Sequence, residues 1–426
     1  MVGCASPGVT AQSTAVPATD SCCTRSVLER GLAIAGKYHV DAITQRRFTH
    51  AELWAAIAPS LKSPALTTRD LGTSLQGRAI RAVSFGHGPR TVLLWSQMHG
   101  DEATATMALA DIFRFLADGG SDPLRLRLEQ ALTITFVPLL NPDGAELFQR
   151  ENAQGIDVNR DARRLASPEA RVLKALHDEL KPQFGFNLHD QSARSRVGPG
   201  GEQVAIALLA PAYNPAREYN ETRSRARLVA SVLARTLSHD IRGRIAKYDD
   251  TFNPRAFGDL IQQWGTSTVL IESGALPADP QKQRLRRLNV AAILGALDAI
   301  ATGSYQAAGT SAYDGLTFNA SSSNDLLVLG GQLVLPGQPP YRADVAIVYD
   351  DAIARRTGKI REIGDLEGAI ALDTLDATGL YLFPRPEALT IRDGKGWLRL
   401  GSRAFLDIRR GPTAQSELVR SLEAGE

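Results

Sequence analysis

The stretch Thr91-Val-Leu-Leu-Trp-Ser-Gln-Met98, which runs directly into His99-Gly-Asp-Glu102, decides the fold of this chain. Its mostly apolar composition is typical of a strand that is buried on both faces of a sheet. From Ala103 to Leu116 the apolar residues recur at helical spacing, and the pattern stops at Gly119-Gly120. A buried strand followed at once by an amphipathic helix predicts a parallel sheet that is covered by helices.

The same alternation of strands and helices continues along the chain and predicts an α/β fold. Local signals mark two helix starts. Thr49 and Glu52 have the spacing of a capping box, and Ser167-Pro168-Glu169 combines an N-cap, a first-turn proline and an acid. The expected strands are residues 78–84, 91–98, 132–140, 184–188, 204–210 and 266–271. The expected helices are residues 27–35, one that opens at 49, 103–116, 168–180, 221–237 and 283–300.

The composition excludes several classes of protein. The 426 residues contain 48 Lys and Arg and 46 Asp and Glu, which gives a net charge of 48 − 46 = +2. Because positive and negative side chains are nearly equal in number, the chain has no net electrostatic field that would attract nucleic acid or an anionic membrane surface. No apolar run approaches the roughly 18 residues that a membrane-spanning helix needs. We therefore expect no nucleic-acid partner and no membrane partner, and the oligomeric state stays open.

The cysteines and the first residues bear on redox chemistry and location. All three cysteines, Cys4, Cys22 and Cys23, precede the α/β pattern, so the rest of the chain holds no disulfide and no Cys-ligated metal. The first residues lack the basic and apolar segments of a secretory signal. We expect residues 1–25 to be a disordered tail and the protein to be cytoplasmic, unless a misassigned start hides an export sequence.

The composition changes after Gly303 and predicts a second domain. Residues 26–303 carry the α/β pattern, and residues 304–324, rich in Ser, Ala, Gly and Asn, are typical of a linker. Short alternating segments broken by Gly, Pro and Asp predict a small all-β domain over 325–426. It resembles the β domain that flanks amidohydrolase barrels, but without a His after His239 the metal motif of that chemistry is absent. We expect an accessory lid, a packing domain or an oligomerisation surface.

Polar groups follow four of the expected strands. These groups are His99 with Glu102, Asn141, His189 and Glu272. In open α/β sheets, ligands bind beyond the carboxyl ends of the strands, so these side chains are expected to meet. Catalytic zinc takes two imidazoles and a carboxylate and leaves a fourth position open for water. His99, Glu102 and His189, the last 87 residues after Glu102, supply such a set.

Five motifs of this sequence together resemble those of one protein family. His99-Gly-Asp-Glu102, Asn141-Pro-Asp-Gly144, Asp157-Val-Asn159-Arg160, His189 and Ile271-Glu272 resemble, in this order, the zinc carboxypeptidase family of carboxypeptidase A/B-like metallopeptidases. The resemblance covers about residues 45–302. It implies a three-layer α/β/α zinc-exopeptidase fold with a mixed, mostly parallel sheet and one zinc ion at the carboxyl edge.

The resemblance also implies roles for individual residues. His99, Glu102 and His189 would hold one Zn²⁺, although carboxylates near a metal also suit manganese or cobalt. Glu272 would be the general base that takes a proton from water and returns it to the leaving amine. Arg150 would stabilise the oxyanion, with Arg163 and Arg164 as competitors for that role.

Substrate-binding residues follow from the same resemblance. Asn159 and Arg160 would grip the terminal carboxylate of the substrate, because the planar fork of an arginine binds a carboxylate with two hydrogen bonds. Asp157 would orient a zinc-binding imidazole, and Tyr248 would cap the substrate. Asp190, directly after His189, departs from the pattern of the digestive members of the family, and it would be either a support for the site or a substrate contact.

The preferred terminal residue is left open. Acids at Asp249, Asp250 and Asp259 would suit a basic terminal residue, whereas Arg255 would suit an acidic one. The leading hypothesis is a zinc-dependent carboxypeptidase that acts on peptides or small acyl-amino acids. The alternatives are a zinc amidase or deacylase on a non-peptide or cell-wall amide, and a non-catalytic binding protein on the same scaffold.

Overall fold

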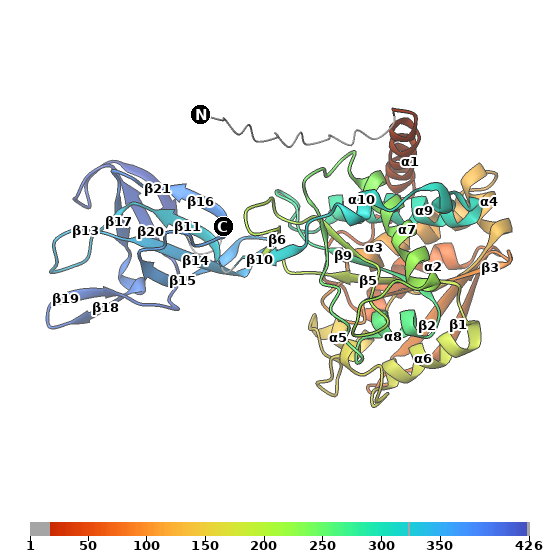
Figure 1. Cartoon of the computed structure of the whole chain (residues 1–426). Coiled ribbons are helices and arrows are strands. Elements are labelled where there is room, and N and C mark those ends of the chain that lie inside the picture. The colour runs from red at the N-terminus through yellow and green to blue at the C-terminus, as the bar shows by residue number, and fades with distance from the viewer. Residues whose placement is uncertain (1–17, 323, 424–426) are drawn as a thin grey trace, which may run out of the picture.

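A central sheet organises the larger part of the computed structural model, which describes residues 18–322 and 324–423 (Figure 1). In sheet order its eight strands are β1 (Leu66–Thr73), β2 (Ala79–Phe85), β4 (Leu132–Val137), β3 (Arg90–Ser96), β5 (Phe184–Asp190), β9 (Ser267–Ser273), β7 (Ile206–Leu209) and β8 (Ile245–Lys247). The four central strands β4, β3, β5 and β9 are parallel to one another. Antiparallel pairs flank them, so the predicted mixed, mostly parallel sheet is confirmed.

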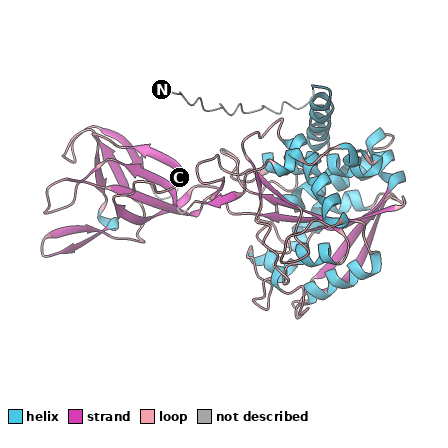
Figure 2. Ribbon diagram, in the orientation of Figure 1, coloured by secondary structure: helices cyan, strands magenta, loops and turns pink. Residues whose placement is uncertain are grey.

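Helices cover both faces of this sheet, as the ribbon diagram shows (Figure 2). A hydrophobic core lies on each face of the sheet. In β3, Val92 and Leu94 face one helical layer, whereas Leu93 and Trp95 face the other. The first layer contains α1 (Ala18–Lys37), α2 (His50–Leu61), α3 (Thr104–Asp118), α4 (Pro123–Ala131), α7 (Glu221–Leu237) and α9 (Gln283–Thr302). The second contains α6 (Pro168–Leu180) and α8 (Phe257–Gln263). The predicted three-layer architecture is therefore confirmed.

The N-terminal helix is longer than predicted. It starts at Ala18, so residues 18–25 are helical and that part of the predicted tail is wrong, while residues 1–17 lie outside the described residues. Packing on α9 stabilises α1: Leu28 and Ile34 are buried, and a Cβ on Gly31 would come within 2.5 Å of Ala291 Cα. Such close packing is a tertiary effect that local helix signals do not contain.

Residues 304–322, within the predicted linker 304–324, contain regular structure that their composition does not predict. They include a 3-10 turn (Ser304–Ala307), the short helix α10 (Ser311–Asp314) and strand β10 (Asn319–Ser321), which pairs with β6 (Ser195–Val197). Tyr305 and Tyr313 are buried against the large domain, and the Tyr313 hydroxyl accepts a hydrogen bond from the Ala210 amide. Two aromatic anchors thus order a segment whose other residues favour a loop.

The C-terminal region forms the predicted small β domain with a core of its own. One sheet has the order β15-β14-β11-β16 and another the order β13-β12-β17-β20-β21, with a β18–β19 hairpin beside them. The strands are β11 (Asn324–Leu329), β12 (Gln332–Leu333), β13 (Tyr341–Arg342), β14 (Asp344–Asp351), β15 (Arg356–Gly364), β16 (Ala371–Asp376), β17 (Tyr381–Pro384), β18 (Leu389–Arg392), β19 (Lys395–Leu398), β20 (Leu406–Arg409) and β21 (Leu418–Leu422). Among the described residues, no helix is both long and apolar enough to cross a membrane.

Candidate active site

The turn after β3 presents the first two candidate ligands, and a close backbone contact fixes it. A Cβ on Gly100 would lie 2.0 Å from the Gly144 carbonyl carbon, so only glycine permits this approach. Asn141 is fully buried behind the turn, where its amide nitrogen donates to the Met98 carbonyl and its Oδ1 accepts from the Gly144 amide. Asn141 therefore supports the turn rather than entering the site.

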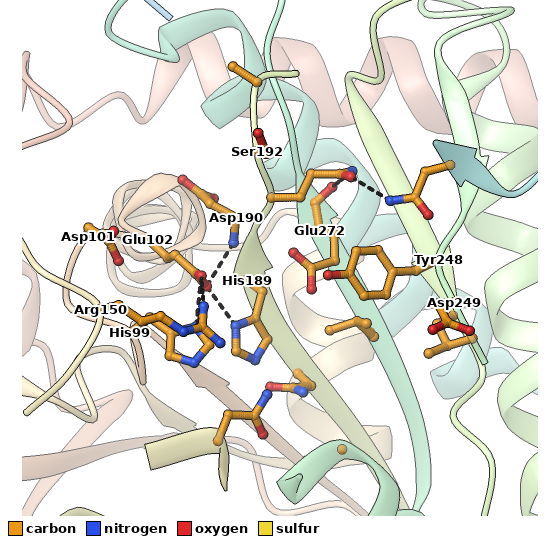
Figure 3. Close-up of a pocket in the computed structure, with 18 of the residues that line it drawn as sticks. His99, Asp101, Glu102, Arg150, His189, Asp190, Ser192, Tyr248, Asp249 and Glu272 are labelled. Atoms are coloured by element: carbon orange, nitrogen blue, oxygen red, sulfur yellow. Dashed lines mark hydrogen bonds and ion pairs between the residues drawn. The ribbon is translucent and has the colours of Figure 1, made fainter. Parts of the chain in front are cut away.

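Three candidate metal ligands meet at the carboxyl edge of the sheet (Figure 3). His99 Nδ1 lies 2.7 Å from Glu102 Oε1, and His189 Nδ1 lies 2.6 Å from Glu102 Oε2. One ligand atom from each of the three residues falls within 4.8 Å of the others, and all three side chains are buried. Two imidazoles and a carboxylate directed at one point are the donor set of a catalytic zinc site, so the residues present fit a zinc ion.

The electrostatics of this cluster also favour a cation. Burial disfavours a charged His99, yet the carboxylates of Glu102 and Asp157 outweigh it and raise the pKa of His99 to about 9. Asp157 Oδ1 lies 3.0 Å from His99 Nε2, on the side of the ring away from Glu102. A carboxylate on the far nitrogen of a ligand imidazole is the usual way in which a metal site fixes the ring.

Arg150 lies directly beside the cluster. Its Nε donates to Asp157 Oδ2 at 3.0 Å, and its NH1 lies 3.1 Å from His99 Nδ1 and 3.3 Å from Glu102 Oε1. With 39% of its side chain exposed, the guanidinium still faces the cavity. Arg163 and Arg164 are exposed and do not line this cavity, which leaves Arg150 as the candidate of the three.

Glu272 stands next to the cluster with one carboxylate oxygen free. It is paired in register with His189 on the adjacent strand and is 6% exposed. Its Oε2 is buried with no hydrogen-bond partner among the described residues. Burial and the nearby Glu102 charge raise the pKa of Glu272 well above its ordinary range, as expected of a group that collects a proton. The Tyr248 ring lies against this carboxylate, whose charge raises the pKa of the tyrosine (Figure 3).

Asn159 and Arg160 line the same cavity from the 3-10 turn Val158–Arg160. Asp157 caps this turn by accepting a hydrogen bond from the Asn159 amide at 2.9 Å. Asn159 Oδ1 accepts from the Phe257 amide at 2.9 Å, which orients the side-chain amide so that its Nδ2 is available as a donor. One segment thus connects the candidate metal ligands to a pair of donors suited to a carboxylate.

The cavity has a volume of about 900 Å³, and its floor is polar. Asn187 is 2% exposed, its Oδ1 has no partner among the described residues, and a Cβ on Gly258 would come within 3.0 Å of its Nδ2. Asp259 also lines the floor, and burial raises its pKa to about 7. Of the other acids, Asp249 is at the rim, whereas Asp250 is held by two arginine side chains. Arg255 is exposed and does not line the cavity, so acceptors rather than a cation form this floor.

A buried ion pair that the sequence did not reveal supports the cluster. Lys282 Nζ donates to Asp190 Oδ2 at 2.8 Å, and the Thr104 hydroxyl donates to the same oxygen. The Asp190 amide donates to Glu102 Oε2 at 3.1 Å, so the pair holds the strand end that carries His189 against the carboxylate ligand. The acid after His189 was a visible signal, but nothing in the sequence pointed to Lys282.

The region that contains most of these residues matches the sequence model of a protein family. Residues 57–197 match the model of the zinc carboxypeptidases. The match covers about a third of the chain, and within it the chain is similar to the zinc carboxypeptidases. The matched segment includes the three candidate ligands, whereas Tyr248 and Glu272 lie beyond it and join the site only through the fold. The predicted family is therefore confirmed.

The similarity to individual proteins is partial. Carboxypeptidase 2 of Trichophyton rubrum is 25% identical over 162 residues, which span 38% of this chain and 29% of that protein. An uncharacterized protein of Zymomonas mobilis is 30% identical over 133 residues, which span 30% of this chain and 34% of that protein. The "putative carboxypeptidase" structure from Burkholderia mallei shares the fold, with a TM-score of 0.50, 19% identity and coverage of 60% of this chain and 69% of that one.

Proposed function

We propose that this protein is a zinc-dependent metallocarboxypeptidase that removes C-terminal residues from peptides. One observation carries the proposal: the free, buried carboxylate of Glu272 lies in one cavity with the three-ligand cluster and with the Asn159–Arg160 pair. Metal ligands, base and carboxylate-binding donors together are the parts that hydrolysis at a free C-terminus requires.

His99, Glu102 and His189 would hold the zinc ion. When bound there, zinc supplies Lewis acidity that polarises a carbonyl and makes water a nucleophile at neutral pH. Glu272 takes the proton from the attacking water and delivers it to the leaving amine, for which its free oxygen and raised pKa suit it. Arg150 donates hydrogen bonds to the carbonyl oxygen as negative charge develops there.

The same cavity positions the substrate. Arg160 and the Asn159 amide donate to the terminal carboxylate, so cleavage is confined to the last peptide bond. The Tyr248 ring covers the bound residue beside Glu272. The acceptors of Asn187 and Asp259 on the floor favour a terminal side chain that carries hydrogen-bond donors, above all Lys or Arg.

Pairs of peptides with free or amidated C-termini test this function. Incubation of the zinc-loaded protein with each pair is followed by mass spectrometry, with and without a chelator. We expect stepwise, chelator-sensitive loss of residues from the free C-termini alone. Replacing zinc with manganese or cobalt then identifies the most active metal.

Two arginine variants provide a matched comparison. Arg160→Gln removes a cavity donor and is expected to raise the KM for free C-termini, whereas Arg164→Gln changes an exposed arginine outside the cavity and is not. Equal hydrolysis of amidated peptides would contradict a carboxypeptidase and point to an amidase. Stable binding without turnover of any peptide would point to a binding protein.

A further inference from the structure

The small β domain reaches into the cavity of the carboxypeptidase domain. Residues 350–353, which are the last two residues of β14 and the first two of the connection to β15 and are called the β14–β15 turn below, line the same cavity as His99 and Glu272. The cavity is therefore built from both domains, and the β domain supplies part of its wall.

An ion pair joins the two domains at this wall. Arg46, in the segment between α1 and α2, donates from NH2 to Asp351 Oδ2 at 2.5 Å. Its backbone amide donates to Gln281 Oε1, and its guanidinium lies 5.4 Å from the Phe148 ring centroid. The side chains of Arg46 and Asp351 are only 18% and 35% exposed and both line the cavity. The pair thus closes one edge of the cavity between the domains.

A second anchor sets the position of the turn. Arg194, in the loop after β5, donates to both oxygens of Asp325 and to the Tyr349 carbonyl. Asp325 has a side chain that is 1% exposed, and its Oδ2 also accepts from the Tyr349 amide. Tyr349 immediately precedes the turn residues, so this buried contact fixes where the turn can lie.

The same loop is tied to the reacting edge of the sheet. Gln191 donates from Nε2 to the Glu272 carbonyl at 3.2 Å and accepts from Asn319 Nδ2 at 3.0 Å. Asn319 lies on β10, which leads into the β domain. The loop after β5 therefore contacts both the β domain, through Arg194, and the strand end that carries Glu272, through Gln191.

The turn is connected through Arg46 to the residues that support the ligand cluster, whereas the carboxylate-binding donors Asn159 and Arg160 belong to the separate Val158–Arg160 turn. Arg46 is bound to Gln281, next to Lys282, and Lys282 pairs with Asp190. Asp101 lies on the side of the ligand cluster away from Tyr248, and Asp190 lies beside the cluster (Figure 3). A peptide whose terminal carboxylate is held by Asn159 and Arg160 and whose last peptide bond lies at Glu272 extends its N-terminal part along the rest of the cavity, whose wall includes residues 350–353.

We propose that the β14–β15 turn, held by the Arg46–Asp351 pair, closes the exit for the N-terminal part of the substrate and restricts the enzyme to short peptides. This inference rests on the proposed function. A cavity of about 900 Å³ is of the size that encloses one small ligand. The substrates are accordingly free peptides of a few residues or small acyl-amino acids, rather than the C-termini of folded proteins.

The test is a series of peptides that share one C-terminal dipeptide and grow only at the N-terminus. The full-length, zinc-loaded protein is assayed for kcat/KM on a blocked dipeptide, a pentapeptide and a decapeptide. We expect the decapeptide to be worse than the blocked dipeptide by about tenfold or more, the scale that steric mismatch imposes on specificity. Equal values for all three lengths would overturn the inference while leaving the proposed function intact. Absence of turnover on every length would overturn the proposed function and the inference with it.

Variants of the ion pair identify the cause of the restriction. Arg46→Gln and Asp351→Asn are each expected to raise the ratio of decapeptide to dipeptide kcat/KM by roughly fivefold, which is the most that a pair of this exposure is worth. The double variant Arg46→Asp with Asp351→Arg restores a pair of reversed polarity and is expected to return the ratio toward the wild-type value.

A control variant separates this effect from damage to the hairpin. Arg355 lies in the same connection between β14 and β15, at an exposed position that does not line the cavity, and Arg355→Gln breaks its surface pair with Asp373 on β16. Its length preference is expected to equal that of the wild type, and thermal unfolding checks that every variant folds. An unchanged ratio in both ion-pair variants, with folding intact, would overturn the role assigned to the turn.

Discussion

Replacing Asp157 by Asn tests how the metal site is built, because it removes one charge and keeps the shape. Asp157 Oδ1 lies 3.0 Å from His99 Nε2, and Oδ2 lies 3.0 Å from Arg150 Nε and 2.9 Å from its NH2. Burial favours the neutral acid, but the hydrogen bond from His99 and the charge of Arg150 hold the pKa of Asp157 below its usual range. Asp157 is therefore ionised at neutral pH, and an amide cannot replace its charge.

Loss of a carboxylate that orients a ligand imidazole typically weakens metal binding by about 10–100-fold, or about 1.4–2.8 kcal/mol. We expect Asp157→Asn to weaken zinc binding by that factor, measured by competition with a fluorescent chelator at neutral pH. Asp259→Asn is the matched control, because Asp259 lines the same cavity and forms none of the described hydrogen bonds or ion pairs with the ligand cluster. Equal zinc affinity for Asp157→Asn and the wild type would refute the assigned role of Asp157.

Further predictions concern catalysis, metal binding, selectivity and stability. Glu272→Gln is expected to lower kcat by about 10²–10⁴-fold while the protein still binds one zinc per chain. His189→Ala is expected to lose the metal. Elemental analysis measures the bound zinc in both variants. Asp259 has a pKa of about 7, so its carboxylate becomes charged as the pH rises through that value. The ratio of kcat/KM for Lys- or Arg-terminal peptides to kcat/KM for Leu-terminal peptides is therefore expected to rise over the same pH range. A ratio that does not change with pH would exclude Asp259 from the terminal pocket. Asp111→Asn leaves the fully buried Arg286 without its charge partner and is expected to lower the free energy of unfolding by about 3–5 kcal/mol in urea titrations.

Local signals were sufficient for much of the carboxypeptidase domain. The Thr49–Glu52 capping box and the Ser167 N-cap lie where the sequence predicted, because capping depends on residues within one turn. The strand ends that carry His99, His189 and Glu272 were identifiable because buried parallel strands have nearly continuous apolar sequences. The carboxyl ends of parallel strands lie at the same edge of the sheet, so the fold class predicted that these side chains lie close together.

Features that depend on long-range contacts were not predictable. Strand β1 has a mostly exposed, polar sequence, and it exists because it pairs with β2 at the edge of the sheet. The Arg46–Asp351 pair joins residues 305 positions apart, and neither residue has a distinctive local context. The structure of residues 304–322 likewise depends on where Tyr305 and Tyr313 find partners, which composition does not record.

If one metal ion at the His99–Glu102–His189 cluster enables hydrolysis at a free C-terminus, activity must follow the occupancy of that site. A titration of the metal-free protein with zinc, in which bound metal and release of the terminal residue are followed together, tests this. We expect activity to rise linearly and to stop rising at one zinc per chain, on the free peptide and not on its amide. Full activity of the metal-free protein, or none with one zinc bound at the cluster, would contradict this expectation.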